Sequence, residues 1–188
     1  MINTWKTGLA ALALASLPLV SACGKEESND LQTATKDDGT LTLAAALGAN
    51  DDLGTLREAI GESELSGVLD GSASYTVLAP SNEAFEALGE ESSTLLEAEQ
   101  RPVLVAILRD HLLPGHLTPE AIGEAIEQNG GPVTMATLGE ADVTFFKTGD
   151  NLTVAMEDGG TATFSGTAIA ANNGVVIPID TVLLPPKG

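Results

Sequence analysis

The sequence predicts an α+β domain, with helices in its first half and short strands in its second half. Helical patterns of apolar residues run from residue 41 to residue 128, interrupted by one strand-like segment at 75–79. After residue 132 the chain consists of short runs rich in Val, Ile, Thr and Phe, separated by turns that contain Gly and Asn. Because helices and strands are segregated along the chain, an alternating α/β order is not expected. No internal repeat is visible, so we expect one module.

The predicted helices have recognisable starts and stops. Thr118 stands where an N-cap belongs, directly before Pro119, and glycines follow the end of that helix at 130–131. Pro102 is tolerable in the helix at 100–109 because it falls in the first turn, and the apolar sequence there predicts burial. The predicted helices cover residues 41–47, 53–60, 64–69, 81–88, 100–109 and 119–128. The predicted strands cover residues 75–79, 133–135, 143–147, 152–156, 161–164, 167–170 and 175–183.

The N-terminal segment has the order of an export signal. Lys6 gives it a positive start, and the apolar run from Leu9 to Val20 is too short for a permanent transmembrane helix. Small residues then precede Cys23, the only cysteine of the chain. This order resembles a bacterial lipoprotein signal, in which residues 1–22 are removed and the Cys23 thiol is acylated. The alternative is an ordinary secretory signal with an incidental cysteine.

Length, charge and cysteine content narrow the classes of function. Removal of residues 1–22 leaves 166 residues, enough for one domain with a core of ordinary size. With Cys23 as the only thiol, no intrachain disulfide can form. The formal net charge is −19, and loss of Lys6 with the signal makes it −20. Such a surface repels phosphate, so nucleic acid is not expected as a partner.

The acidity has two interpretations. It favours solubility, and this is the interpretation we adopt. Weak calcium binding at Asp51-Asp52 or at Glu157-Asp158 is the alternative, although neither pair lies in a loop with DxDxDG-type alternation.

Residues 24–40 differ from the rest of the chain in composition. They are polar, small and charged, with a single leucine, and cannot bury enough apolar surface to offset the entropy of ordering. We therefore expect an acylated Cys23 and a flexible acidic tether over 23–40, followed by a folded domain over 41–186.

Three segments resemble the hallmarks of fasciclin domains. Residues 75–88 (YTVLAPSNEAFEAL) are similar to the first hallmark, a strand followed by a Pro-Ser/Thr-Asn/Asp-x-Ala-Phe helix start. Residues 108–117 (LRDHLLPGHL) resemble the central His-x-x-Pro-Gly segment, and residues 173–185 (NGVVIPIDTVLLP) resemble the closing hallmark. All three stand in family order. The resemblance implies a single fasciclin-like domain, with N-terminal helices packed on a wedge or sandwich of short, mostly antiparallel strands.

The first hallmark predicts a strand that ends where a helix begins. Pro80 cannot donate to a sheet ladder and so ends the strand. Ser81 or Asn82 then accepts hydrogen bonds from the free amides that open the helix. Phe85 can pin this helix to the sheet.

The other two hallmarks predict turns and a paired carboxylate. Pro114 and Gly115 form a turn in which Gly115 is free to take positive φ. Asn173 and Gly174 fit a tight hairpin turn that delivers the last strand into the sheet. Asp180 lies in an apolar strand, so we expect it to accept hydrogen bonds and to hold two segments in register.

His111 lies between an apolar helix and the Pro-Gly turn, where family members usually carry a histidine. We expect it to bridge this turn to another part of the core through hydrogen bonds, with metal ligation or acid–base chemistry as alternatives. His116 follows at a spacing that suits neither one helix face nor one strand face, so a surface position is expected. We expect no metal site, no cofactor and no catalytic residue.

The sequence departs from the family pattern at two places. Many members have a histidine three residues after Asn-Gly, where this chain has Ile177 followed by Pro178. A proline removes one ladder hydrogen bond, so the strand is expected to be at an edge or bulged there. Asp110 stands where the family often has an aromatic residue before His111, so the Tyr-His pair to which the family's activity has been attributed is not intact.

The resemblance implies adhesion through protein, matrix or glycan binding, without catalysis. Our first interpretation is a binding module held at the membrane by its lipid. A carrier of a small ligand or metal ion is the alternative, with a groove between the helices and the sheet edge as its site. A hydrolase has the least support, since neither Gly-x-Ser-x-Gly nor His-Glu-x-x-His occurs.

The residue after Cys23 bears on localisation. Aspartate at this place commonly retains lipoproteins at the inner membrane of enteric-type bacteria. Gly24 occupies it here, which favours the outer membrane. Periplasmic and surface-exposed orientations both stay open.

Overall fold

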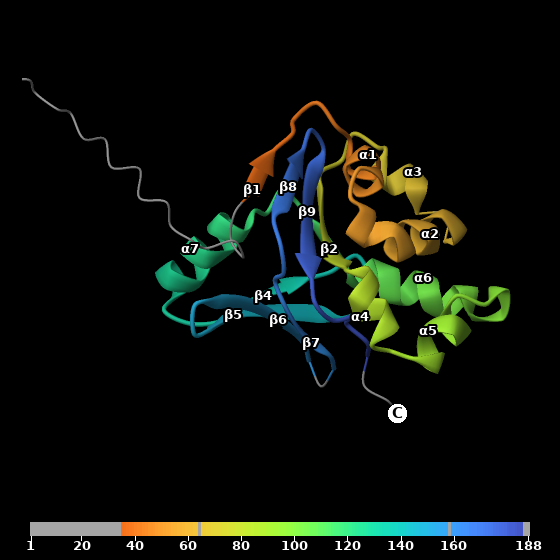
Figure 1. Cartoon of the computed structure of the whole chain (residues 1–188). Helices are drawn as coiled ribbons and strands as arrows, with labels where there is room; N and C mark the ends of the chain where they lie inside the picture. Colours follow the sequence, from red (N-terminus) through yellow and green to blue (C-terminus); the bar gives the residue numbers. More distant parts are fainter. Residues whose placement is uncertain (1–34, 64, 158, 186–188) are drawn as a thin grey trace, which may run out of the picture.

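Two β-sheets and a layer of helices make up the molecule (Figure 1). The computed structural model describes residues 35–63, 65–157 and 159–185. The helices are α1 (Leu43–Gly48), α2 (Gly54–Glu62), α3 (Ser66–Leu69), α4 (Asn82–Glu86), α5 (Glu90–Leu95), α6 (Arg101–Asp110) and α7 (Pro119–Asn129), with 3-10 turns η1 (Asp51–Leu53) and η2 (Ala98–Gln100).

One sheet has five strands and the other has four. In spatial order the first contains β1 (Thr35–Asp37), β8 (Ala168–Ala171), β9 (Gly174–Ile179), β2 (Tyr75–Pro80) and β3 (Leu112–Pro114). The second contains β4 (Val133–Ala136), β5 (Asp142–Thr148), β6 (Asn151–Met156) and β7 (Thr161–Thr163). Parallel pairing joins β1 to β8 and β2 to β9, and the other neighbours are antiparallel. The predicted α+β class with mostly antiparallel strands is confirmed.

The five-stranded sheet lies between two apolar layers. Helices α1 to α6 cover one face, and the four-stranded sheet and α7 cover the other (Figure 1). Along β2, Val77 packs against the helices and Leu78 packs toward the four-stranded sheet. Every residue of β9 is buried because both of its faces are covered. This explains why β9 has a continuous apolar run and no alternation of apolar and polar residues.

Pro178 lies where one side of β9 has lost its neighbouring strand. The β8–β9 ladder reaches only Ile169 opposite Val176, whereas β2 accompanies β9 to its end. Ser81 N–H donates to Ile179 O, so the odd-numbered residues of β9 face β2 and Pro178 faces the vacated side. Its carbonyl accepts from Ser165 N–H at 2.8 Å. The expectation of a local edge is confirmed.

The first described residues differ from the expectation. Residues 35–37 were expected in the flexible tether, and they form β1 beside β8. The tether prediction is wrong for these residues because an edge strand is held by backbone hydrogen bonds and needs little apolar surface. Asp38 N–H continues the ladder to Ala170 O at 2.8 Å. The predicted signal at 1–22, Cys23 and the predicted tether up to residue 34 lie outside the described residues, whereas residues 38–40 form the turn that follows β1.

Within the described ranges, no helix combines the length and apolar composition that crossing a membrane requires.

Candidate functional site

His111 is a buried joint between the middle of the chain and its C-terminal segment. Its side chain is 1 % exposed. Nδ1 lies 2.8 Å from Ile107 O, and Nε2 lies 3.1 Å from the backbone nitrogen of Leu183. An N–H can only donate and a carbonyl can only accept, so these partners assign the proton to Nδ1. Burial lowers the pKa of His111 below 6.5, although the Ile107 hydrogen bond and the charge of Asp110 act in the opposite direction.

This environment determines what His111 can do chemically. Both ring nitrogens are engaged by the backbone, and the ring is closed off from solvent. A general base needs a free nitrogen within reach of a substrate, and a metal ligand needs a lone pair. The predicted bridging contacts are confirmed. His116, predicted at the surface, is exposed.

Asn173 makes a second buried joint. Its Oδ1 accepts from Leu43 N–H at 2.8 Å, and its Nδ2 donates to Leu69 O at 2.7 Å and to Gly71 O at 2.9 Å. One side chain therefore ties the β8–β9 turn to the start of α1 and to the end of α3.

Gly174 is required by the close approach of β2. The hairpin turn consists of residues 172–173, and Gly174 is already the first residue of β9. The hairpin was predicted correctly, but its turn lies one residue earlier than expected. With φ at 155°, a Cβ on Gly174 would overlap the carbonyl oxygen of Tyr75. Only glycine allows the two strands to pair at this point.

The Pro-Gly turn after β3 has the predicted geometry. Gly115 has a φ of 103°, and its N–H donates to Ser74 O at 2.9 Å. The buried Thr76 hydroxyl donates to Gly115 O at 2.9 Å and accepts from Leu117 N–H at 2.8 Å. Thr76 was missed because a threonine in a strand has no distinctive pattern in the sequence. Pro114 is exposed at the end of β3.

Ser81 and Asn82 cap two different helices. Ser81 Oγ accepts from Ala84 N–H at 3.2 Å at the start of α4, as predicted. Asn82 instead accepts from Thr55 N–H at 3.0 Å, in the first turn of α2. Phe85 is 3 % exposed and belongs to the core beneath the helices.

Asp180 holds β9 to the edge of the four-stranded sheet. It follows β9 and is exposed, not buried within an apolar strand. Its Oδ1 accepts from Thr163 N–H at 2.8 Å, and its own N–H donates to Thr163 O at 3.1 Å. The predicted role in register is confirmed, and the same contacts cover part of the free edge of β7.

An open groove of about 670 Å³ brings three of the predicted site residues together. Ser81, Asn82 and Asp180 line it at the point where the parallel strands β2 and β9 end. The other polar side chains along it include Asn50, Asp52, Glu83, Ser165 and Thr167, and Ile169 and Pro178 give it apolar surface. We call this the strand-end groove. His111 and Asn173 do not reach it.

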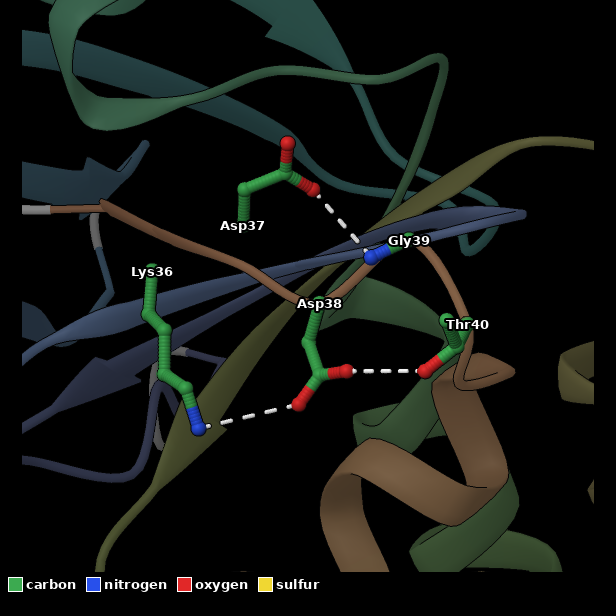
Figure 2. A network of polar contacts seen from close by, with 5 residues as sticks. All are labelled: Lys36, Asp37, Asp38, Gly39 and Thr40. Carbon is green, nitrogen blue, oxygen red and sulfur yellow. Dashed lines mark hydrogen bonds and ion pairs between the residues drawn. The ribbon is translucent and has the colours of Figure 1, made fainter.

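Strand β1 contributes Lys36 to the strand-end groove. Figure 2 shows the polar contacts at the end of β1 and just after it: Lys36 Nζ lies 3.6 Å from Asp38 Oδ2, and Asp38 Oδ1 accepts from the Thr40 hydroxyl at 3.0 Å. Asp37 Oδ1 accepts from Gly39 N–H at 3.1 Å, which forms a local turn.

A metal ion needs several ligand side chains around one point. Over 35–63, 65–157 and 159–185, no group of three or more His, Cys, Asp or Glu side chains is placed to hold an ion. Asp51 and Asp52 are exposed at η1, and Glu157 is exposed after β6. Asp158, the other member of that acidic pair, lies outside the described residues.

Asp110 is another buried polar residue that was not proposed as a site from the sequence. It is 7 % exposed at the end of α6. Its Oδ1 accepts from Ala141 N–H at 3.2 Å and from the Thr137 hydroxyl at 3.3 Å. The sequence marked it only as a departure from an aromatic position. Its partners lie about 30 residues away, and no local pattern announces them.

These features define a helix-covered, two-sheet module with buried polar joints and an open surface groove. The chain belongs to the fasciclin domain family, whose model matches residues 51–185. Fasciclin domains are modules of the cell-adhesion type.

Two proteins are similar to this chain in sequence. Protein sll1483 of Synechocystis sp. is 30 % identical over 187 residues, covering 96 % of this chain and 94 % of that protein. The transforming growth factor-beta-induced protein ig-h3 of Sus scrofa is 33 % identical over 135 residues, which is 72 % of this chain and 18 % of that much longer protein.

A solved structure has the same fold. The FAS1 domain pair of the insect cell adhesion molecule Fasciclin I matches with a TM-score of 0.67 at 14 % identity. The match covers 77 % of this chain and 51 % of the domain pair.

Proposed function

We propose that this protein is a non-catalytic adhesion module, held by an acylated Cys23 at the bacterial outer membrane, that binds a protein, matrix or glycan partner. The family supports the adhesion-type role. The sequence order before Cys23 supports the lipid anchor.

The observation that carries the non-catalytic role is the engagement of His111. The residue best suited to acid–base chemistry has both nitrogens bonded to the backbone inside the core. The other buried hallmark side chain, Asn173, is likewise used by backbone groups. The polar atoms of these two side chains therefore stabilise the fold, and the proposed binding uses the surface of the domain.

The strand-end groove is the proposed binding site. It joins residues of the first and closing hallmarks, and its mixture of hydroxyl, amide, carboxylate and apolar surface suits a polar macromolecular partner. Its volume also falls in the range of small-ligand sites, which keeps the carrier as the second candidate.

Binding can be tested with two variants on one helix. Glu83→Arg changes a residue that lines the strand-end groove, whereas Glu86→Arg makes the same charge change on an exposed residue of α4 away from the groove. We expect pull-down from envelope extracts and cell aggregation to be reduced by Glu83→Arg and retained by Glu86→Arg. Equal behaviour of the two variants would refute the groove, and no partner for the unaltered chain would refute adhesion. A stoichiometric small molecule in native mass spectrometry would favour the carrier.

The anchor and its orientation need separate measurements. Metabolic labelling with a radioactive fatty acid should mark the unaltered chain and not Cys23→Ala. Protease treatment of intact cells should remove the domain if it is displayed outside, and protection would assign it to the periplasmic side.

A further inference from the structure

Helix α6 has an apolar outer face that the rest of the chain does not cover. Its apolar sequence predicted a buried helix, but Val103 is 47 % exposed, and Pro102 and Ala106 are exposed as well. The expectation of full burial is wrong because the inward face already fills the core with Leu104, Ile107 and Leu108.

A second groove runs along this face. It has a volume of about 550 Å³ and lies between α6 and the loop at 138–141. Val105, Ala106, Leu138, Ala141 and Pro185 line it with apolar surface. We call it the α6 groove. It shares no lining residue with the strand-end groove.

Asp110 presents one carboxylate oxygen to the α6 groove. Its Oδ1 is held by Ala141 N–H and the Thr137 hydroxyl, while Oδ2 has no hydrogen bond among the described residues. Every fully buried side-chain nitrogen or oxygen in the described ranges has a partner. Oδ2 must therefore be reached by solvent, and the groove that Asp110 lines gives it that access.

The orientation of this carboxylate is fixed by its surroundings. Gly139 passes so close that a Cβ there would overlap Asp110 Oδ1. A side chain that is nine-tenths buried and held through one oxygen loses little freedom when a ligand contacts the other oxygen.

Among the charged side chains that line the α6 groove, Asp110 has the strongest attraction for a cation. Arg109 and Glu140 both line the groove and are exposed. Their charges are opposite and screened by water, and neither forms an ion pair within the described residues. The buried carboxylate lies in a lower dielectric and attracts a cation more strongly.

We propose that the α6 groove binds a lysine side chain presented by an apolar segment of a partner protein. The methylene stem would lie along Val105 and Ala106, and the ammonium would donate to Asp110 Oδ2. A guanidinium needs two free oxygens for its paired geometry, and Oδ1 is already engaged, so the geometry favours an ammonium. The net charge of −19 would attract such a partner from a distance. This site goes beyond the proposed adhesion groove and does not depend on it.

The test uses the full chain labelled with ¹⁵N in detergent and two blocked tripeptides, acetyl-Leu-Lys-Leu-amide and its uncharged norleucine analogue. The lysine peptide should shift the amide resonances of Val105, Arg109 and Ala141 saturably. The norleucine peptide should bind about tenfold more weakly or worse, because it lacks the ammonium.

Three variants make the test specific. Asp110→Asn keeps Oδ1 as an acceptor and replaces the free oxygen, so lysine-peptide binding should weaken about tenfold or more. Ala106→Lys places an ammonium on an exposed position of the same helix, four residues before Asp110, and should block the groove without disturbing the core. Asp52→Asn makes the same charge change in the strand-end groove and should leave binding within about twofold.

Several outcomes would overturn the proposal. These are equal binding of the two peptides, no binding of either, or shifts confined to residues of the strand-end groove. Undiminished binding by both Asp110→Asn and Ala106→Lys would do the same. Shifts of the α6 resonances with protein concentration alone would assign the groove to a second copy of this chain.

Discussion

His111 Nε2 accepts a hydrogen bond from Leu183 N–H at 3.1 Å, across 72 residues of sequence. This contact joins the central fasciclin hallmark to the closing one inside the core. The Nδ1 bond to Ile107 O fixes the ring at its other side. The imidazole therefore acts as a structural bridge between α6 and the last segment of the chain.

Removing this bridge should destabilise the fold. His111→Leu leaves Leu183 N–H and Ile107 O without their imidazole partner, and we expect a loss of about 2–4 kcal/mol in the free energy of unfolding. The measurement is urea denaturation followed by circular dichroism. His116→Ala changes the exposed histidine and should stay within about 0.5 kcal/mol. An equally small effect of His111→Leu would contradict the bridging role.

Stability should also depend on pH through His111. Burial lowers its pKa below the ordinary 6.5, so the unfolded chain takes up the proton at a higher pH than the folded chain does. The stabilisation that neutral His111 provides is complete above about pH 6.5. It is lost as the pH falls from there toward the pKa of His111 in the folded chain, and the free energy of unfolding then changes by up to about 1.4 kcal/mol per pH unit.

Urea midpoints measured between pH 5 and pH 8 check this dependence. The carboxylates give a background that variants share, so the difference between the unaltered chain and His111→Leu isolates the histidine. This difference should shrink on acidification. A difference that stays constant with pH would mean that His111 is not buried as a neutral ring.

Replacing Asn173 should lower the stability of the fold, because its side chain makes three hydrogen bonds. Asn173→Ala removes the partner of Leu43 N–H, Leu69 O and Gly71 O, and about 3 kcal/mol or more of stability should be lost. Asn172→Ala, in the same turn but exposed, should lose about 0.5 kcal/mol or less. Similar losses for both would mean that the turn, and not the side-chain bonds, is responsible.

Two glycines should respond to alanine in opposite directions. Gly174→Ala places a Cβ against Tyr75 O, so β2 and β9 must separate and several kcal/mol should be lost. Gly61→Ala lies in α2 with open space around the new atom and should stabilise by about 0.5–1 kcal/mol. Thermal unfolding measures both changes. A Gly174→Ala variant as stable as the original would disprove the close approach.

Local patterns predicted most of the helices and strands, but they missed β1, β3 and α5. Thr118 and Ser81 each cap a helix as expected, and Gly130 ends α7 with a φ of 68°. These features depend on neighbouring residues, so the sequence carries them directly. Asn82 shows where local patterns fail, because its side-chain amide caps α2 by accepting from Thr55 N–H, 27 positions earlier in the chain.

The remaining differences between the expected and the observed structure arise from contacts between segments far apart in the sequence. A polar segment became β1 because β8 offered free backbone groups, and an apolar helix stayed half exposed because its other face sufficed for the core. The groove-facing oxygen of Asp110 depends on Thr137 and Ala141, which approach only in the folded chain. Neither composition nor periodicity encodes such contacts.

The measurement closest to the central claim is long-range ¹H–¹⁵N NMR of the His111 ring at pH 7. We expect a neutral ring with its proton on Nδ1 and a resonance protected from solvent exchange. A charged ring, or a proton on Nε2, would contradict the structural role of His111 and would reopen acid–base chemistry at the site.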